Sequence, residues 1–151
     1  MATALRERDE ANTAALAARL RLVIARTARR LRQEAGLDLS PSQSAALATI
    51  EAHGPLAPSA LATLERIQRP TATRILARLE EAGLVERAGD PADGRVSLVS
   101  TSRRGAALLR RLRGRKNAYL ARRLRGLEPD ELRTLERATD ILERLLADEP
   151  R

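Results

Sequence analysis

Three side chains near the middle of the chain have the type and spacing needed to read the edge of a base pair. Thr71, Arg74 and Arg78 recur at intervals of three and four residues, so a helix would place them on one face. Arginine can donate two hydrogen bonds to O6 and N7 of guanine, and threonine can hydrogen-bond to a base or touch a thymine methyl group. Arg69 and Thr73 would flank this face. The same pattern is also typical of an ordinary solvated helix face.

A second candidate group lies in a segment rich in glycine, proline and aspartate. Residues 89–95 separate two short runs of strand-forming residues, 84–87 and 96–100, which predicts a β-hairpin with a polar tip. Within this tip, the Asp93 carboxylate could orient the Arg95 guanidinium. An arginine on a projecting hairpin can enter a narrow minor groove, where negative potential is concentrated. The alternative is an exposed turn whose ion pair contributes little to stability.

The remaining pattern is helical. Apolar residues recur at helical spacing in six segments bounded by glycine, proline and capping residues. These predicted helices cover residues 12–35, 40–53, 60–64 (after Pro58-Ser59), 68–81, 102–124 and 128–147. Ser40 is a good N-cap for the second of them, with Gln43 at the capping-box spacing. In the third, we expect Ala60, Leu61 and Leu64 to face inward.

The order of these elements predicts the fold. Four helices, a hairpin and two further helices give a mainly α fold with a small β-hairpin wing, that is, a winged helix-turn-helix preceded and followed by long helices. In this arrangement the helix over residues 68–81 enters the major groove. We expect Ala46, Leu47 and Ile50 to form the buried face of the 40–53 helix, and Ser102 to cap the helix after the hairpin.

The composition argues against enzymes and metal proteins. The 151 residues include no cysteine and one histidine, which excludes a thiolate nucleophile, a cysteine zinc site and a multi-histidine metal site. There is also no nucleophile–base pair and no phosphate-binding loop, so we expect no enzymatic activity, no metal and no cofactor.

No apolar run approaches the roughly 20 residues that span a bilayer, and the start lacks the apolar stretch of a signal peptide. We therefore expect a soluble, cytoplasmic protein without a membrane partner.

The charge of the chain favours a polyanionic partner. It has 28 basic and 20 acidic residues, a net charge of +8, and every basic residue except Lys116 is arginine, although genomic codon bias could also produce this content. Arginine binds phosphate through two hydrogen bonds. Residues 101–126 contain no acid, whereas residues 127–151 contain eight. The two segments could pair their charges within a chain or across a dimer, or the basic one could face DNA phosphates or line an anion-binding pocket.

Three stretches of the sequence resemble the MarR family of bacterial transcriptional regulators. They are Pro-Thr-Ala-Thr-Arg at 70–74, Leu-Glu-Glu-Ala-Gly-Leu-Val-Glu-Arg at 79–87 and Asp-Pro-Ala-Asp-Gly-Arg at 90–95. The last is the most specific, and the resemblance spans nearly the whole chain. It implies a homodimer that binds a pseudo-palindromic operator in double-stranded DNA, and we expect a repressor. It also implies an N-terminal dimerisation helix (1–36), a DNA-binding lobe (37–101) and C-terminal dimerisation helices (102–151).

The resemblance assigns roles to individual residues. The start of the recognition helix would contact DNA through Gln68, Arg69, Thr71, Thr73 and Arg74, and the wing through Arg95 with Asp93 as its partner. Family members touch phosphates from helix starts, which in this chain carry Ser40, Ser42 and Ser59; these could equally be plain N-caps. The dimer interface would include Leu16, Leu20, Leu120, Leu135, Leu142 and Leu145. A small phenolic or carboxylate effector would bind where the long helices meet the lobe, and cysteine-based peroxide sensing is excluded.

One departure from the family concerns the base of the wing. Members often have Leu-Thr-Pro after the second strand, where this chain has Thr101-Ser102-Arg103. A buried apolar position thus becomes Thr101, and we expect the fold to persist with altered packing.

The alternative function is a non-specific architectural nucleic-acid-binding protein, because charge alone would support it.

Overall fold

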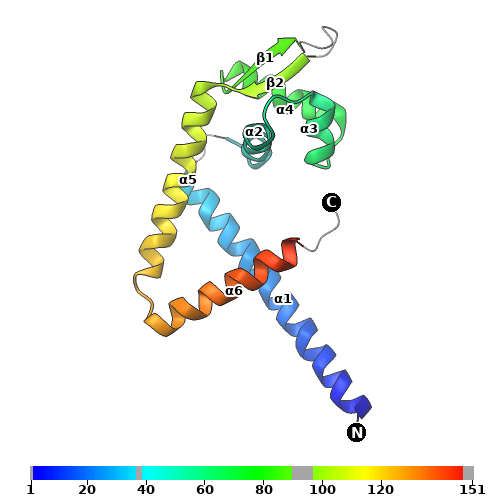
Figure 1. The fold of residues 1–151 in the computed structure, drawn as a ribbon, viewed down its shortest axis with the longest axis vertical. Helices are drawn as coiled ribbons and strands as arrows, with labels where there is room; N and C mark the ends of the chain where they lie inside the picture. Colours follow the sequence, from blue (N-terminus) through cyan, green and yellow to red (C-terminus); the bar gives the residue numbers. More distant parts are fainter. Residues whose placement is uncertain (1, 37–38, 90–96, 148–151) are drawn as a thin grey trace. The chain divides into compact units, whose positions relative to one another are not determined.

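The computed structural model describes residues 2–36, 39–89 and 97–147. Its elements are α1 (Ala2–Ala35), α2 (Pro41–His53), α3 (Pro58–Leu64), α4 (Arg69–Glu81), β1 (Val85–Gly89), β2 (Ser97–Thr101), α5 (Arg103–Leu124) and α6 (Pro129–Ala147). Figure 1 shows these elements along the chain. The chain divides after Lys116, within α5, into two units, and each is described by itself. The predicted fold class, mainly α with one two-stranded hairpin, is confirmed.

Helix α1 is longer than the sequence pattern predicts. It begins at Ala2 rather than at Asn12, because the residues before Asn12 are mostly good helix formers without the repeated apolar positions that marked the predicted start. At its other end, Gly36 has a φ of 97°, the left-handed conformation that stops a helix. Arg115 of α5 donates from Nη1 to the carbonyl oxygen of Ala35 at 2.9 Å, so the end of α1 is fixed to α5.

Helix α2 begins with the predicted capping box. The Gln43 backbone N–H donates to Ser40 Oγ at 3.2 Å, and the Ser40 backbone N–H donates to Gln43 Oε1 at 2.9 Å. Pro41 occupies the first turn, where its missing N–H costs nothing. The predicted buried face is confirmed, since Ala46, Leu47 and Ile50 are all buried.

Helices α3 and α4 form the helix-turn-helix. Leu61 and Ala62 are buried, but Ala60 and Leu64 are exposed, so the prediction that these two face inward is wrong. Neighbouring positions lie about 100° apart on a helix, and a face centred between 61 and 62 turns Ala60 and Leu64 outward. In the turn, Arg66 adopts a left-handed φ of 51°.

The hairpin pairs β1 with β2 in antiparallel register from Val85↔Thr101 to Gly89↔Ser97. Strand β1 begins one residue later than predicted, because Leu84 is held in the preceding turn by a hydrogen bond to the Leu79 carbonyl. Val96, where the second strand was predicted to begin, lies outside the described residues. Strand β2 is also bridged to the segment before α3: Leu56 and Val99 exchange backbone hydrogen bonds of 3.0 and 2.9 Å. The predicted tip of the hairpin, with Asp93 and Arg95, lies outside the described residues.

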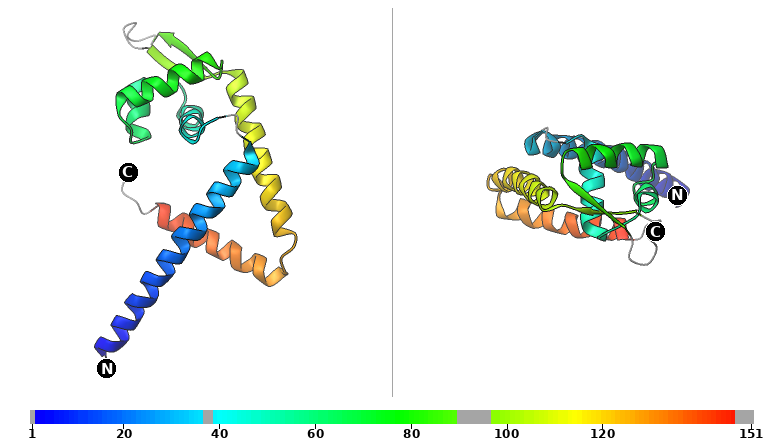
Figure 2. Two further views of the ribbon diagram at one scale, coloured as in Figure 1. Left: turned by 180° about the vertical axis from the view of Figure 1, so that it is seen from behind. Right: turned by 90° about the horizontal axis from the view of Figure 1, so that it is seen from above.

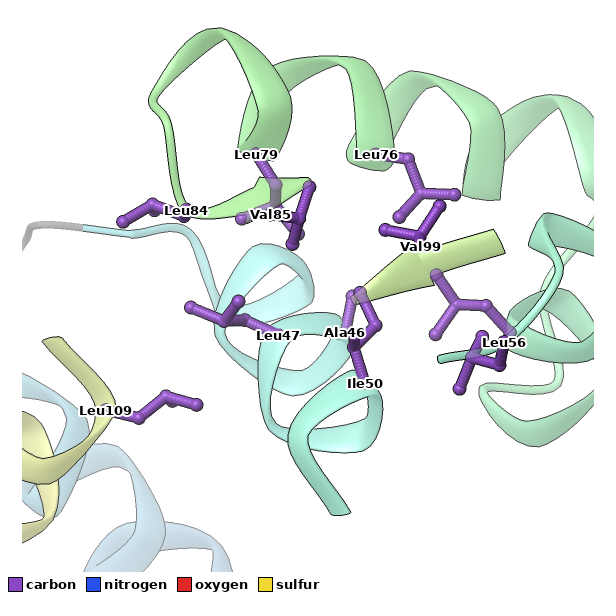
Figure 3. Close-up of a cluster of buried hydrophobic side chains, with 11 residues drawn as sticks. Ala46, Leu47, Ile50, Leu56, Leu76, Leu79, Leu84, Val85, Val99 and Leu109 are labelled. Carbon is purple, nitrogen blue, oxygen red and sulfur yellow. The ribbon is translucent and has the colours of Figure 1, made fainter. Parts of the chain in front are cut away.

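One hydrophobic core joins these elements. Figure 3 shows Leu47 and Ile50 of α2, Leu76 and Leu79 of α4 and Val99 of β2 in the cluster, and all five are fully buried. Leu109 of α5 belongs to the same cluster. Figures 1 and 2 show α2, α3 and α4 gathered next to the hairpin. This packing fixes the orientation of α4, because its buried side chains meet both α2 and β2.

The start of α5 is pinned to the end of α4. As predicted, Ser102 caps α5, with its Oγ accepting from the Gly105 backbone N–H at 3.0 Å. The same hydroxyl donates to the Gly83 carbonyl oxygen at 2.7 Å. Ser102 is itself buried, so both bonds satisfy a group that has left water.

The second unit contains the end of α5 and helix α6. Tyr119 lies under the guanidinium groups of Arg122 and Arg123, 5.7 and 5.6 Å from the ring centre. Glu131 accepts from the Glu128 backbone N–H at 2.9 Å, which caps the start of α6. None of the helices in the described ranges is long and apolar enough to cross a membrane.

Candidate nucleic-acid interface

The solvent face of α4 carries four of the residues predicted to bind DNA. Arg69, Thr73, Arg74 and Arg78 are exposed, whereas Thr71 is half-buried at the border of the core. The prediction of an outward face therefore holds for the two arginines of the original triplet and only partly for Thr71. Gln68 is the exposed N-cap of α4, without a side-chain capping bond.

Two exposed residues on this face were missed from the sequence. Pro70 and Ala77 lie on the side of α4 opposite its buried residues Ala72, Leu76 and Leu79. Both are small and apolar, and they stand next to Arg74 on the helix surface. Alanine and other apolar side chains can touch the methyl group of thymine. Helical spacing alone could have found them, but a search for polar side chains passes over them.

The two central arginines differ in their partners. Arg78 forms an ion pair with Glu81 one turn later, at 3.4 Å, and these side chains are 68% and 72% exposed. A pair this exposed contributes little and is easily exchanged for another acceptor. Arg74 makes no ion pair with any of the described acids. Its guanidinium is therefore available to an external acceptor.

The structure brings Arg74 and Arg78 next to the start of α2. Together with Ser40, Ser42, Gln43 and Ile75 they line a shallow hollow of about 320 Å³. The start of α2 carries the partial positive charge of the helix dipole, which attracts anions, although the capping box already pairs the Ser40 and Gln43 N–H groups. Two arginines and this helix end thus surround one hollow on the surface of the lobe, which is suitable for a phosphate group. Gln43 was recognised only as a capping residue.

The three predicted serines have different surroundings. Ser40 is a true N-cap, so that alternative is confirmed for it. Ser42 is exposed in the first turn of α2 and lines the hollow. Ser59 is exposed near the start of α3, whose N-cap is Ala57, and it is not part of the hollow. Asp93 and Arg95 lie outside the described residues, so their positions are not assigned.

A separate pocket of about 210 Å³ lies where α1, α2 and α5 meet. Its lining is mainly apolar, with Ala35, Leu39 and Leu112, and it also includes Arg29, Arg32 and Lys116. All of these residues belong to the first unit. The combination of an apolar wall and several cations suits a small organic anion. Among the described residues there is no cluster of side chains that could hold a metal ion.

These features define a winged helix-turn-helix protein. A helix pair presents an exposed second helix with arginine and threonine, a two-stranded hairpin follows directly, and long helices flank the lobe. This is the architecture of a class of nucleic-acid-binding proteins.

Comparisons with known proteins identify the family. The model of the MarR family matches residues 39–97. An HTH-type transcriptional regulator of Mycobacterium leprae is 38% identical over 138 residues, which cover 91% of this chain and 96% of the relative. One from Mycobacterium tuberculosis is 39% identical over the same coverage. The chain therefore belongs to the MarR family of transcriptional regulators, as the sequence motifs predict.

Solved structures agree with this assignment. A transcriptional regulator from Pseudomonas aeruginosa is 34% identical, with a TM-score of 0.81 over 89% of this chain and 95% of the other. The MarR protein of E. coli, in its apo form, is 27% identical, with a TM-score of 0.68 over 84% and 96% of the two chains. These likenesses cover 84–89% of this chain, so they support the predicted winged helix-turn-helix fold.

Proposed function

We propose that this chain is a repressor that binds a pseudo-palindromic operator as a homodimer, with α4 in the major groove. The observation that carries the proposal is the position of Arg74. It is exposed at the centre of the α4 face, makes no ion pair with a described acid, and lines the hollow at the start of α2. A side chain in this position can reach a base edge while the helix start beside it holds a phosphate.

The other α4 residues have complementary roles in this proposal. Thr73 and the apolar Pro70 and Ala77 would contact bases and thymine methyl groups, and Arg78 would exchange Glu81 for a phosphate. Gln68, Arg69, Thr71 and Ser59 would contribute at the edges of the interface. Arg95, oriented by Asp93, would enter the minor groove beside the site. A mutant of MepR from S. aureus, which has the same fold with a TM-score of 0.68, has been solved bound to an oligodeoxyribonucleotide.

The homodimer is supported by apolar side chains that the single chain leaves in water. Leu16 is 63% exposed on α1 and Leu145 is 59% exposed on α6. Leu135 is also exposed, and the other residues predicted at the interface, Leu20, Leu120 and Leu142, are only half-buried. Stripes of this kind are costly in a monomer and are typical of a surface that a second copy covers. Two recognition helices would then enter major grooves about 10 bp apart.

A small anion could release the repressor. The pocket between α1, α2 and α5 offers an apolar wall with Arg29, Arg32 and Lys116, which suits a phenolic or carboxylate ligand. A ligand that binds one arrangement of these helices better would shift the population away from the DNA-binding arrangement. The ligand would have to lower DNA affinity at concentrations that saturate this pocket.

The test is a binding experiment with the DNA upstream of the protein's own coding sequence. Complexes are measured with excess unrelated competitor DNA and over a series of salt concentrations. A complex that survives the competitor supports a sequence-specific regulator, and loss of repression from a reporter in a deletion strain supports the repressor role.

The net charge of +8 favours one alternative, a non-specific architectural protein. For this function, any DNA would compete equally and affinity would fall steeply with salt.

A further inference from the structure

Recognition helix α4 and the hairpin are linked by one ion pair. Arg87 of β1 donates from Nε to Glu80 Oε2 at 2.8 Å. Glu80 lies in the last turn of α4, so the bond connects the C-terminal end of this helix to the strand that follows it. Within the described part of the chain, no other side-chain hydrogen bond connects α4 with either strand.

The backbone between Glu80 and Arg87 forms a turn at Gly83 and Leu84, here called the joint, which hydrogen bonds hold in place. The Leu84 N–H donates to the Leu79 carbonyl at 2.9 Å, and the Ser102 N–H donates to the Leu84 carbonyl at 3.0 Å. The Ser102 hydroxyl also donates to the Gly83 carbonyl. The chain therefore leaves α4 and enters β1 at a point that the start of α5 holds in place.

Beyond this joint, β1 has little support of its own. Val85 is buried, but the strand from Glu86 to Gly89 is exposed. Among the described residues, β1 pairs only with β2, whose Val99 is anchored to Leu56. Arg87 stands opposite the buried Val99, so its side chain lies on the face of the hairpin that looks toward the core.

The Glu80–Arg87 ion pair therefore connects α4 and β1 at some distance from the turn that joins them. Arg87 lies two residues beyond Val85, about 7 Å along the strand, and Glu80 lies one turn before the joint. The Arg87 side chain is 31% exposed and the Glu80 side chain 44%. An ion pair that connects α4 and β1 away from the turn that joins them resists a change in the angle between the helix and the strand. We call this ion pair the brace.

We propose that Glu80 and Arg87 are positioning residues that set the angle between the recognition helix and the hairpin for DNA binding. The proposal rests on the proposed function. Neither side chain needs to touch DNA for this role: the pair orders the two DNA-binding elements before the complex forms, which lowers the cost of binding.

Removal of Glu80 separates this role from simple electrostatics. Glu80→Ala removes a negative charge from a DNA-binding protein, which by charge alone would tighten binding. If the brace positions the helix and the hairpin, Glu80→Ala should instead weaken DNA binding. An exposed ion pair contributes up to about 1 kcal/mol, so binding should weaken by about fivefold for each protomer that engages DNA.

Glu81→Ala is the matched control. It removes the same charge at the next position, but its ion pair with Arg78 lies within α4 and links no second element. We expect Glu81→Ala to bind DNA at least as tightly as the wild type. Affinity is measured at one salt concentration, and thermal unfolding confirms that both variants are folded. If Glu80→Ala fails to fold, Glu80→Gln replaces it in the comparison.

A charge reversal supplies a readout that a general loss of stability would not give. Arg87→Glu places two carboxylates together and should weaken binding more than Glu80→Ala does. The double variant with Glu80→Arg and Arg87→Glu restores an ion pair and should recover most of that loss. The brace is overturned if Glu80→Ala binds as tightly as Glu81→Ala, or if the folded double variant binds no better than Arg87→Glu.

The outcome is distinguishable from a failure of the proposed function. If wild-type protein forms no competitor-resistant complex, the proposed function fails before any variant is compared. If the wild type forms that complex and Glu80→Ala binds DNA with the same affinity as Glu81→Ala, only the positioning role of the Glu80–Arg87 pair is contradicted.

Discussion

Gly105 lies against the backbone carbonyl of Leu84, so closely that a Cβ atom at position 105 would stand 2.1 Å from that oxygen. The same Cβ would be 3.0 Å from the Thr101 Cγ2 atom. Helix α5 therefore approaches the joint between α4 and β1 at a distance that only glycine permits. The orientation of the lobe on its long helix depends on this backbone contact.

Gly105→Ala should destabilise the protein by about 2–3 kcal/mol, because the backbone of α5 must move away from Leu84. Gly114→Ala is the control: it lies in the same helix with nothing within 4 Å of the added Cβ, and it should stabilise by about 0.5–1 kcal/mol. Denaturant unfolding at a fixed protein concentration measures both. Equal stabilities for the two variants would contradict the close contact.

Thr101→Val should stabilise the protein. The Thr101 Oγ1 atom is buried and has no hydrogen-bond partner among the described residues, and valine has nearly the same shape without the hydroxyl. A gain of about 1 kcal/mol in the free energy of unfolding is expected, because the cost of desolvating that hydroxyl disappears. Thr63→Val, at an exposed threonine that donates to the Ser59 carbonyl, should give no such gain. A loss of stability in Thr101→Val would show that the hydroxyl has a partner.

Ser102→Ala should have the opposite effect, although it also removes a single hydroxyl at the neighbouring position. Ser102 Oγ is engaged in two hydrogen bonds, to Gly105 and Gly83, and its loss removes the partner of the buried Gly105 N–H and of the part-buried Gly83 carbonyl. The expected cost is about 2 kcal/mol in the free energy of unfolding. The same denaturant experiment measures it, and a change below the error of the method would rule out the double role of this serine.

Local features of the lobe could be predicted from the sequence. The capping box of Ser40 and Gln43, the cap at Ser102 and the buried stripe of α2 depend on residues a few positions apart, and all were confirmed. The start of α1 was missed because residues before Asn12 have helix propensity without an apolar pattern. In α3, the seven-residue helix was too short to distinguish the inward Leu61 from the outward Leu64.

The parts of the site that depend on tertiary packing could not be predicted. Ser42 and Arg74 line one hollow because α2 crosses α4 in the fold, and no sequence spacing indicates that. The Glu80–Arg87 pair requires the turn at Gly83 to bring the strand back past the helix end. The unsatisfied Thr101 hydroxyl was foreseen only as a change in packing.

Leu145→Arg should disrupt the proposed homodimer. Leu145 is 59% exposed on α6, and a charge there would be buried without a partner in a dimer, at a cost of several kcal/mol. Sedimentation equilibrium should show monomers where the wild type forms dimers. Asp140→Arg, on the polar side of the same helix, makes a larger change in charge and should leave the dimer intact. Wild-type dimerisation in Leu145→Arg would place the interface elsewhere.

The most direct test of the central claim is the specificity of Arg74→Ala. Dissociation constants are measured at one salt concentration for the upstream site and for unrelated DNA. If Arg74 reads a base, the variant loses about 1–3 kcal/mol at the site, about 5- to 150-fold, and much less on unrelated DNA. An equal loss on both DNAs, with the salt slope reduced by about one, would make Arg74 a phosphate contact and contradict base reading by α4.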